Sequence, residues 1–229
     1  GCPPVRDQAS CGSCWAFGTL GVLECSILIK DQAVVDLSEQ WLVSCNQSGW
    51  DCDKGGNWSF YYLLDAGAPF ALTDSLGETG AVLERDSIYR AMDLPCQGPY
   101  DRRYKIASWA YVAPNDTIAP TDAIKQAILD YGPVATTVYV GDAFDAYTGG
   151  VFNVNEVGVV NHAVVLVGWD DSRNAWILRN SWGESWGEAG YMYIEYGCSM
   201  VGYCTCYAEY EGDGAQGQAP VAYFTVSNP

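Results

Sequence analysis

The sequence predicts an α+β protein of two lobes with a cleft between them. In the first half of the 229-residue chain, apolar residues recur at helical spacing. In the second half, short apolar runs are divided by Gly, Asp and Asn turns, a pattern typical of strands. With 49% hydrophobic residues, the chain can bury a sizeable core. We therefore expect a helical lobe over about 1–108 and an antiparallel, barrel-like β lobe over about 109–210.

The helical lobe is expected to begin with a helix from Cys14 to about Lys30. Its apolar face would consist of Trp15, Phe17, Leu20, Val22, Leu23, Ile27 and Leu28. Ser38 is a good N-cap residue and predicts a short second helix after it. Aromatic residues at helical spacing predict a third helix over 57–65. The stretch 71–95 has no regular pattern, so we expect an extended loop there.

The β lobe is expected to contain one helix and several strands. The helix is predicted over 121–131, capped by Thr121 or Asp122 and ended by Gly132-Pro133. The strands are predicted at 134–140, 161–169, 176–180 and 190–195.

Residues 211–220 have the composition of a linker. An alternating apolar pattern then predicts a strand within 221–229. Two interpretations of this strand stay open. It resembles the opening strand of the immunoglobulin-like PKD repeats that follow secreted microbial enzymes, and it is equally compatible with a strand docked on the β lobe.

The composition limits the class of partner and the compartment. The net charge is −17, from 28 acidic and 11 basic residues, which argues against binding to nucleic acid or an anionic membrane. No apolar run is long enough to span a membrane. Ten cysteines indicate disulfides, and therefore a secreted or other oxidising compartment. The first residues are not a signal peptide, so we expect any signal or pro-segment to lie outside this sequence. We expect a monomer.

Three residues form a candidate catalytic group. Cys14 begins the first predicted helix, where the macrodipole favours the thiolate, which is the nucleophilic form. His162 is the only histidine of the chain and precedes an apolar run, so it is the natural general base. The side-chain amide of Asn180 can accept a hydrogen bond from an imidazole N–H and hold the ring.

Together these segments resemble the papain-like cysteine proteases from Pro4 to about Tyr210. The motifs that carry the resemblance occur in the family's order: Gln8-Ala-Ser-Cys11-Gly-Ser-Cys14-Trp15, Gly55-Gly56, Asn161-His162-Ala163 and Asn180-Ser181-Trp182-Gly183. The resemblance implies a papain-like two-lobe fold over 1–210 and a cysteine endopeptidase that forms a thioester acyl-enzyme. It implies no cofactor and no metal. The implied partners are protein or peptide substrates, protein inhibitors and a pro-peptide.

The resemblance also assigns roles to individual catalytic residues. Cys14 would be the nucleophile, and His162 would protonate the leaving amine. Asn180 would orient the imidazole, and Trp182 would shield that contact from water. Gln8 would donate its side-chain amide to the oxyanion, together with the backbone N–H of Cys14.

Substrate contacts follow from the same resemblance. The residues implied are Gly55, Gly56, Trp58, Thr137, Val160, Asn161, Ala163, Trp182 and Glu209. Gly56 would bind an extended substrate backbone. The S2 pocket, which holds the second residue before the scissile bond, would be mainly apolar. With Glu209 at its floor, this pocket would accept hydrophobic residues as well as Arg or Lys.

The cysteines divide into implied pairs and open ones. The resemblance implies two disulfides, Cys11–Cys52 and Cys45–Cys96. Cys198 is compatible with pairing to Cys204 or Cys206, with Cys2 taking the other. Cys25 lies inside the first predicted helix, and we expect it to be a buried free thiol.

Two other functions are compatible with parts of the sequence. Cys11 and Cys14 form a C-x-x-C motif before a helix, as in thiol–disulfide oxidoreductases. That function requires a preceding β-strand, which the first residues do not predict, and it leaves His162 and Asn180 without a role. The second alternative is a catalytically inactive, peptide-binding homologue, which would not need all the candidate catalytic residues to be present.

Overall fold

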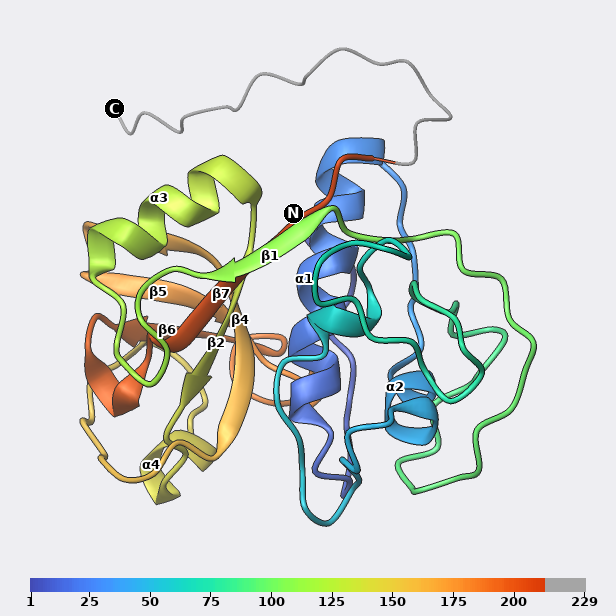
Figure 1. Cartoon of the computed structure of the whole chain (residues 1–229). Coiled ribbons are helices and arrows are strands. Elements are labelled where there is room, and N and C mark those ends of the chain that lie inside the picture. Colours follow the sequence, from blue (N-terminus) through green and yellow to red (C-terminus); the bar gives the residue numbers. More distant parts are fainter. Residues whose placement is uncertain (213–229) are drawn as a thin grey trace.

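A computed structural model describes residues 1–212 and confirms the predicted α+β class (Figure 1). Helices and most of the irregular segments occupy one half of the molecule, and the β-sheet, with further helices, occupies the other. Most of the predicted linker at 211–220 and all of the predicted strand at 221–229 lie outside the described residues. Within residues 1–212, no helix has the length and apolar character needed to cross a bilayer.

The strands of residues 1–212 form one open sheet in the order β1-β7-β2-β4-β5-β6-β3. Neighbouring strands are antiparallel except β3 and β6, which are parallel. The strands are β1 (Ser108–Tyr111), β2 (Val134–Val138), β3 (Val151–Phe152), β4 (His162–Asp170), β5 (Ala175–Arg179), β6 (Tyr191–Glu195) and β7 (Tyr203–Glu209). The four predicted strands correspond to β2, β4, β5 and β6. Strands β1, β3 and β7 were not predicted.

Helix α3 (Thr121–Tyr131) has the predicted bounds and ends at Gly132, which has a φ of 96°. The expected capping by Thr121 or Asp122 is wrong, because the N-cap residue is Pro120 and no side chain caps the helix. Proline is tolerated here because the first helical turn needs no N–H from this position. Two shorter helices of this half are α4 (Asp142–Asp145) and η2 (Cys198–Met200).

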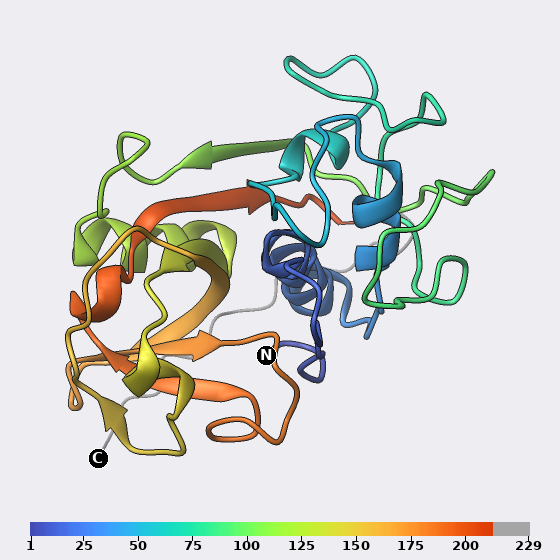
Figure 2. The ribbon, with the colours of Figure 1, turned by 90° about the horizontal axis from the view of Figure 1, so that it is seen from below.

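Helix α1 (Cys14–Asp31) runs through the middle of the molecule, between the sheet and the irregular segments (Figures 1 and 2). Its residues are buried continuously over 15–27, as expected for a central helix. At Gly21, a Cβ atom would lie 2.8 Å from Arg179 Nη1 and 3.2 Å from Val165 Cγ2. A larger residue at this position would therefore have to displace the Arg179 side chain and shift Val165.

Helix α2 (Glu39–Cys45) begins after Ser38, whose hydroxyl accepts a hydrogen bond from Trp41 N at 2.9 Å. This confirms the predicted cap. The predicted third helix over 57–65 is wrong in length, because only a short 3-10 helix, η1 (Phe60–Tyr62), forms. Carbonyl groups of this stretch accept hydrogen bonds from distant backbone N–H groups: Tyr61 from Leu72, Tyr62 from Gly80, and Leu63 from Ile106. These bonds take the place of the bonds that a longer α-helix would make.

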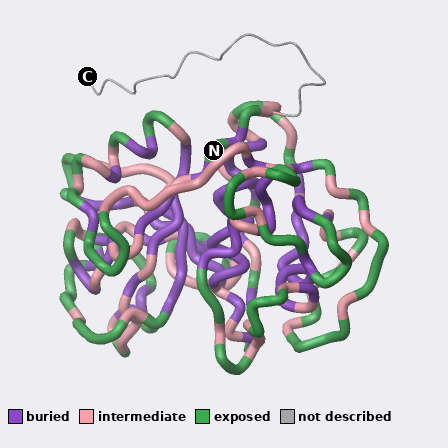
Figure 3. Tube along the Cα trace, viewed as in Figure 1, coloured by how far each residue is buried: buried purple, intermediate pink, exposed green. Residues whose placement is uncertain are grey.

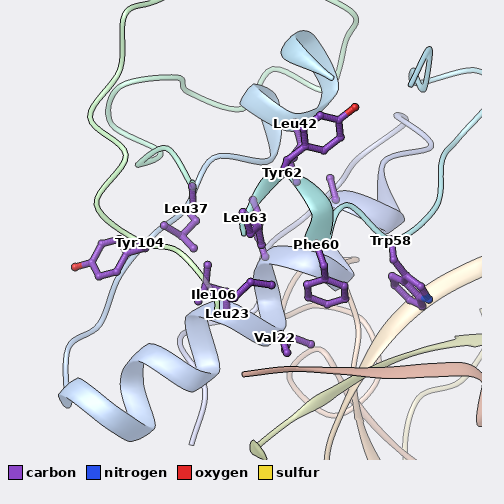
Figure 4. Close-up of a cluster of buried hydrophobic side chains, with 14 of the residues drawn as sticks. Val22, Leu23, Leu37, Leu42, Trp58, Phe60, Tyr62, Leu63, Tyr104 and Ile106 are labelled. Atoms are coloured by element: carbon purple, nitrogen blue, oxygen red, sulfur yellow. The ribbon is translucent and has the colours of Figure 1, made fainter. Parts of the chain in front are cut away.

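Buried residues, purple in Figure 3, occur in both halves of the molecule. Buried apolar side chains of the described residues form two clusters. The first surrounds α1, and Figure 4 labels ten of its members, Val22, Leu23, Leu37, Leu42, Trp58, Phe60, Tyr62, Leu63, Tyr104 and Ile106. It also includes Ala163 and Val165 of β4. The second cluster belongs to the sheet half, and its members include Phe144, Trp176, Leu178, Met192 and Ile194. Because the first cluster contains both α1 and β4, it fixes the helix on the sheet.

Three disulfides form within residues 1–212: Cys2–Cys25, Cys11–Cys52 and Cys45–Cys96. The second and third have the pairing that the resemblance implied. The expectation that Cys25 is a free thiol is wrong. The N-terminal segment packs into the protein interior beside α1, where Val5 is buried and Arg179 Nη2 donates a hydrogen bond to Pro4 O at 2.9 Å. This course brings Cys2 to Cys25.

Four cysteines of the described chain are unpaired: Cys14, Cys198, Cys204 and Cys206. The expected pairing of Cys198 with Cys204 or Cys206 is therefore wrong. Cys198 belongs to η2, and Cys206 is buried within β7. Cys14 remains available for chemistry.

We predict that the Cys2→Ser/Cys25→Ala variant has a free energy of unfolding about 3 kcal/mol lower than the wild type. The disulfide stabilises the fold because it reduces the number of conformations available to the unfolded chain. Urea unfolding without reductant measures the difference. As a control, Cys204→Ser removes an unpaired thiol and changes the free energy of unfolding by less than about 0.5 kcal/mol. Alkylation of Cys25 in denatured, unreduced wild-type protein would contradict the pairing.

Candidate active site

Cys14 is the first residue of α1 and lines a cleft of about 760 Å³. The cleft lies where the N-terminal end of α1 meets the first residues of β4. Among the predicted site residues, those that line it are Gln8, Cys14, Gly55, Gly56, Thr137, Val160, Asn161, His162, Ala163 and Trp182. The fold therefore brings together candidate residues that are far apart in the sequence.

His162 is held by two neighbours that follow β5. Its Nε2 atom lies 2.7 Å from Asn180 Oδ1, and its ring stacks on Trp182 with the centroids 4.7 Å apart. Asn180 Oδ1 also accepts a hydrogen bond from Ser181 N at 2.8 Å. Because this oxygen is an acceptor, Nε2 carries the proton, and Nδ1 is left with its lone pair. Antiparallel pairing of β4 with β5 brings the histidine and the asparagine together.

Burial opposes charge on both reactive groups. It lowers the pKa of His162 to about 4, against which the hydrogen bond to Asn180 acts. Burial also raises the pKa of the Cys14 thiol, while hydrogen bonds from backbone N–H groups, first that of Ala163, lower it. The expected effect of the helix N-terminus is therefore outweighed by burial. Each group taken alone is neutral at pH 7, so a thiolate at this site requires transfer of the thiol proton to the imidazole.

The side chain of Gln8 is buried and held from both sides of the cleft. Its Nε2 donates to Cys11 O at 2.9 Å, and its Oε1 accepts a hydrogen bond from Ser181 Oγ at 2.7 Å. The backbone N–H of Gln8 donates to Ser181 O at 2.8 Å. The residue that follows Asn180 therefore also positions the Gln8 amide. Ser181 lies within the motif Asn180-Ser181-Trp182-Gly183, but its role was not predicted from the sequence.

Gly56 lies against the indole of Trp15. A Cβ atom at Gly56 would lie 2.7 Å from Trp15 Cδ2, so any larger residue would displace the ring or the loop. Gly55 has a φ of 71°, which favours glycine. This loop is attached to the segment before α1, where Gly12 N donates to Cys52 O at 2.9 Å. Gly55 and Gly56 thus line the same cleft as Cys14.

Trp58 is not part of the cleft surface. It is buried beneath it, and its Nε1 donates a hydrogen bond to Cys204 O at 3.0 Å. Thr137 is paired with Ala163 across β2 and β4, and its hydroxyl donates to Tyr203 O at 3.0 Å. Thr137, Ala163 and Tyr203 therefore form one continuous part of the cleft wall.

The expectation that Glu209 forms the floor of the S2 pocket is wrong. Glu209 ends β7, is exposed, and accepts a hydrogen bond from Ser108 Oγ at 2.8 Å. The cleft is lined by the other end of this strand, at Tyr203 and Cys204. Glu209 is the fifth residue after Cys204, a distance of about 16 Å along extended chain. Its partner across the sheet is Ser108 of β1, and neither residue lines the cleft.

Asp116 is a carboxylate of the cleft wall that sequence reasoning missed. Its Oδ1 lies 3.7 Å from the sulfur of Cys204, and it makes no ion pair with another described residue. Asp116 belongs to the exposed loop after β1, and Cys204 N donates to Thr117 O of this loop at 3.1 Å. No local pattern in the sequence marks a loop residue that a distant strand brings to a site.

The Cys11–Cys52 disulfide bears on the redox alternative. Cys11 is engaged with Cys52, and Cys14 is unpaired. The two cysteines of the C-x-x-C motif therefore do not form the dithiol or disulfide pair that a thiol–disulfide oxidoreductase uses.

The chain is similar to known proteins in sequence and in fold. A family model described as papain family cysteine protease matches residues 2–211. The gamete and mating-type specific protein A of Dictyostelium discoideum is 36% identical over 198 residues, which are 83% of this chain and 40% of that protein. The pro-cathepsin H of Mus musculus is 34% identical over 214 residues, 89% of this chain and 59% of that protein. The chain thus spans about half the length of these curated relatives.

A solved structure has the same overall arrangement. The bromelain protease from Ananas comosus, in complex with the E64 inhibitor, superposes with a TM-score of 0.75 at 26% sequence identity. The match covers 92% of this chain and 94% of that one. The predicted fold is confirmed by this similarity.

We predict that in a Cys14→Ala variant the imidazole of His162 titrates near pH 4, because it is buried and has no thiolate beside it. Because His162 is the only histidine, its ring resonances in an NMR titration are unambiguous. In Cys14→Ala/Asn180→Ala the pKa falls further, because the hydrogen bond that favours the protonated ring is lost. A pKa near 6.5 in the single variant would show that the ring is solvated instead.

Proposed function

Because the chain belongs to the papain family of cysteine proteases, we propose that it is a cysteine endopeptidase with Cys14 as its nucleophile. One observation carries the proposal. The cleft that contains the unpaired Cys14 thiol also contains His162, whose ring is fixed by Asn180. A thiol, a base and a group that orients the base are the parts required for nucleophilic attack on an amide.

In the proposed reaction, His162 Nδ1 takes the proton of the Cys14 thiol. The thiolate attacks the carbonyl carbon of the peptide and forms a tetrahedral intermediate. His162 then gives its proton to the leaving amine, the C–N bond breaks, and a thioester remains on Cys14. Water, deprotonated by His162, attacks the thioester and releases the carboxylate product and the free thiol. The stacked ring of Trp182 covers the His162–Asn180 hydrogen bond and keeps competing water away.

The developing oxyanion would be bound by Gln8 Nε2 and the backbone N–H of Cys14. The side chain of Gln8 is already held by Ser181, so little reorganisation is needed when the intermediate forms. One N–H of Gln8 Nε2 donates to Cys11 O, and its second N–H would donate to the oxyanion. A donor of this kind typically contributes about 10²–10³-fold to the rate.

The substrate would bind in extended form beside Gly55 and Gly56. Its P2 side chain, the second before the scissile bond, would pack against the mainly apolar cleft wall formed by Thr137, Val160 and Ala163. Asp116 supplies a carboxylate near this wall that has no ion-pair partner among the described residues. We therefore infer that the pocket accepts hydrophobic residues as well as Arg or Lys, and that Asp116 binds the basic ones.

Partners and compartment follow from the same proposal. The substrates would be proteins or peptides, and a protein inhibitor would compete for the cleft. One relative is named pro-cathepsin H, which supports a pro-peptide as a further partner of this chain. The disulfides of residues 1–212 fit an oxidising, extracytoplasmic compartment.

We predict that an E64-type peptidyl epoxide, the inhibitor named with the bromelain structure, forms one adduct on Cys14 and abolishes casein cleavage. Intact mass and peptide mapping identify the adduct. The adduct does not form in Cys14→Ala. It forms much more slowly in His162→Ala, because the Cys14 thiol then has no base to accept its proton. Cys198→Ser, which alters an unpaired thiol outside the cleft, reacts like the wild type. Unmodified Cys14 in active wild-type protein would refute this assignment.

We predict that Asp116→Asn lowers kcat/KM for substrates with Arg at P2 by up to about fivefold, the value of one partly exposed ion pair. For substrates with Leu at P2, kcat/KM changes less than twofold. Glu209→Gln is the matched control, because it removes a carboxylate that lies outside the cleft, and it affects neither substrate. An equal loss for both substrates in Asp116→Asn would contradict the proposed role.

A further inference from the structure

Tyr89 reaches the candidate active site from the irregular segment between α2 and β1. Its hydroxyl donates a hydrogen bond to Gln8 O at 2.9 Å and lies 2.6 Å from Ser13 Oγ. Since the Tyr89 proton goes to Gln8, Ser13 is the donor in the second bond. A hydrogen-bonded chain therefore runs from Ser13 through Tyr89 to Gln8.

We propose that Tyr89 is a positioning residue for catalysis, acting through the two elements that would bind the oxyanion. This inference rests on the proposed peptidase function. Ser13 directly precedes Cys14, so the Tyr89–Ser13 bond restrains the first turn of α1, where the nucleophile and its backbone N–H lie. The Tyr89–Gln8 bond restrains the peptide unit that carries the Gln8 side chain.

The two hydrogen bonds of the Tyr89 hydroxyl are important because their other partners, Ser13 and Gln8, are both buried. Ser13 is fully buried, and its other acceptor, Cys11 O, lies at the long distance of 3.5 Å. Although Ser13 is the N-cap residue of α1, its side chain makes no capping hydrogen bond. Without the Tyr89 hydroxyl, the Ser13 hydroxyl loses the shorter of its two hydrogen bonds. The first turn of α1 and the Gln8 backbone are then free to shift.

Tyr89 is itself held firmly, although its segment has no regular secondary structure. Its backbone N–H donates to Glu84 Oε1 at 2.8 Å, and its ring packs edge-to-face on Phe17 of α1 at 5.0 Å. The next residue, Arg90, donates its backbone N–H to Gln40 Oε1 of α2 at 2.8 Å. Burial raises the pKa of Tyr89 to about 12, so the hydroxyl keeps its proton at any working pH. The restraint that Tyr89 imposes on Ser13 and Gln8 therefore does not depend on pH.

The test compares Tyr89→Phe with Tyr210→Phe. Tyr210 is the matched control, because its hydroxyl donates to Asp31 Oδ2 at 2.6 Å at the opposite end of α1, away from the cleft. We expect kcat to fall about 10- to 100-fold in Tyr89→Phe with KM within twofold of the wild type, because oxyanion contacts act mainly in the transition state. Tyr210→Phe retains wild-type kcat. Thermal unfolding of both variants shows whether their losses of stability are similar.

Ser13→Ala removes the same hydrogen bond from its other end and serves if Tyr89→Phe does not fold. It should lower kcat in the same way, and the double variant should be less impaired than the product of the single effects. If Tyr89→Phe and Ser13→Ala keep kcat within twofold of an active wild type, or raise KM alone, the positioning role is refuted. If the wild type neither cleaves peptides nor reacts with the epoxide, the proposed function fails, and this inference fails with it.

Discussion

The close packing of α1 on β4 is the contact on which the candidate site depends. The helix contributes Cys14 at its first residue, and the strand contributes His162 at its first residue. Gly21 permits the approach, and a buried pair then crosses the interface, with Arg179 Nη2 3.8 Å from Glu24 Oε2. Arg179 also binds carbonyl groups of the N-terminal segment. The helix, the sheet and the segment that leads to Gln8 are thus held at one point.

The reactive groups are supported from both halves of the molecule. Ser181, which follows β5, binds the oxygen atoms of both Asn180 and Gln8. The base and the proposed oxyanion donor therefore share one anchor. This arrangement keeps polar groups oriented in a buried environment, where an electrostatic interaction is stronger than in water and reorganisation is small. Burial keeps the thiol and the imidazole neutral when each is considered alone, so their reactivity belongs to the pair.

Local signals in the sequence predicted the elements that local interactions form. Ser38 capped α2 as expected, and the apolar runs gave four of the strands. The motifs located the candidate catalytic residues, because each motif carries a side chain with distinctive chemistry. Two of the failures came from long-range interactions. Backbone bonds to distant segments limited η1, and the course of the N-terminus gave Cys25 a partner.

Asp116, which lines the cleft, and Tyr89, which contacts Gln8 and Ser13, were not predicted for the same reason. Asp116 and Tyr89 lie on loops whose positions are set by contacts with distant elements, so residue spacing could not reveal them. The prediction that Glu209 forms the floor of the S2 pocket failed for the converse reason. Counting residues from Cys204 gave a plausible position, but an extended strand carries the chain out of the cleft within a few residues.

The irregular segment between α2 and β1 bears on the resistance of this chain to proteolysis. Backbone without helix or strand hydrogen bonds is the kind that opens locally and enters a cleft in extended form. Here the Cys11–Cys52 disulfide attaches this segment to the residues just before α1, and the Cys45–Cys96 disulfide attaches it to the end of α2. Tyr89 and Asp74 add hydrogen bonds along it. These attachments raise the free-energy cost of local opening and so limit the access of a protease to this backbone.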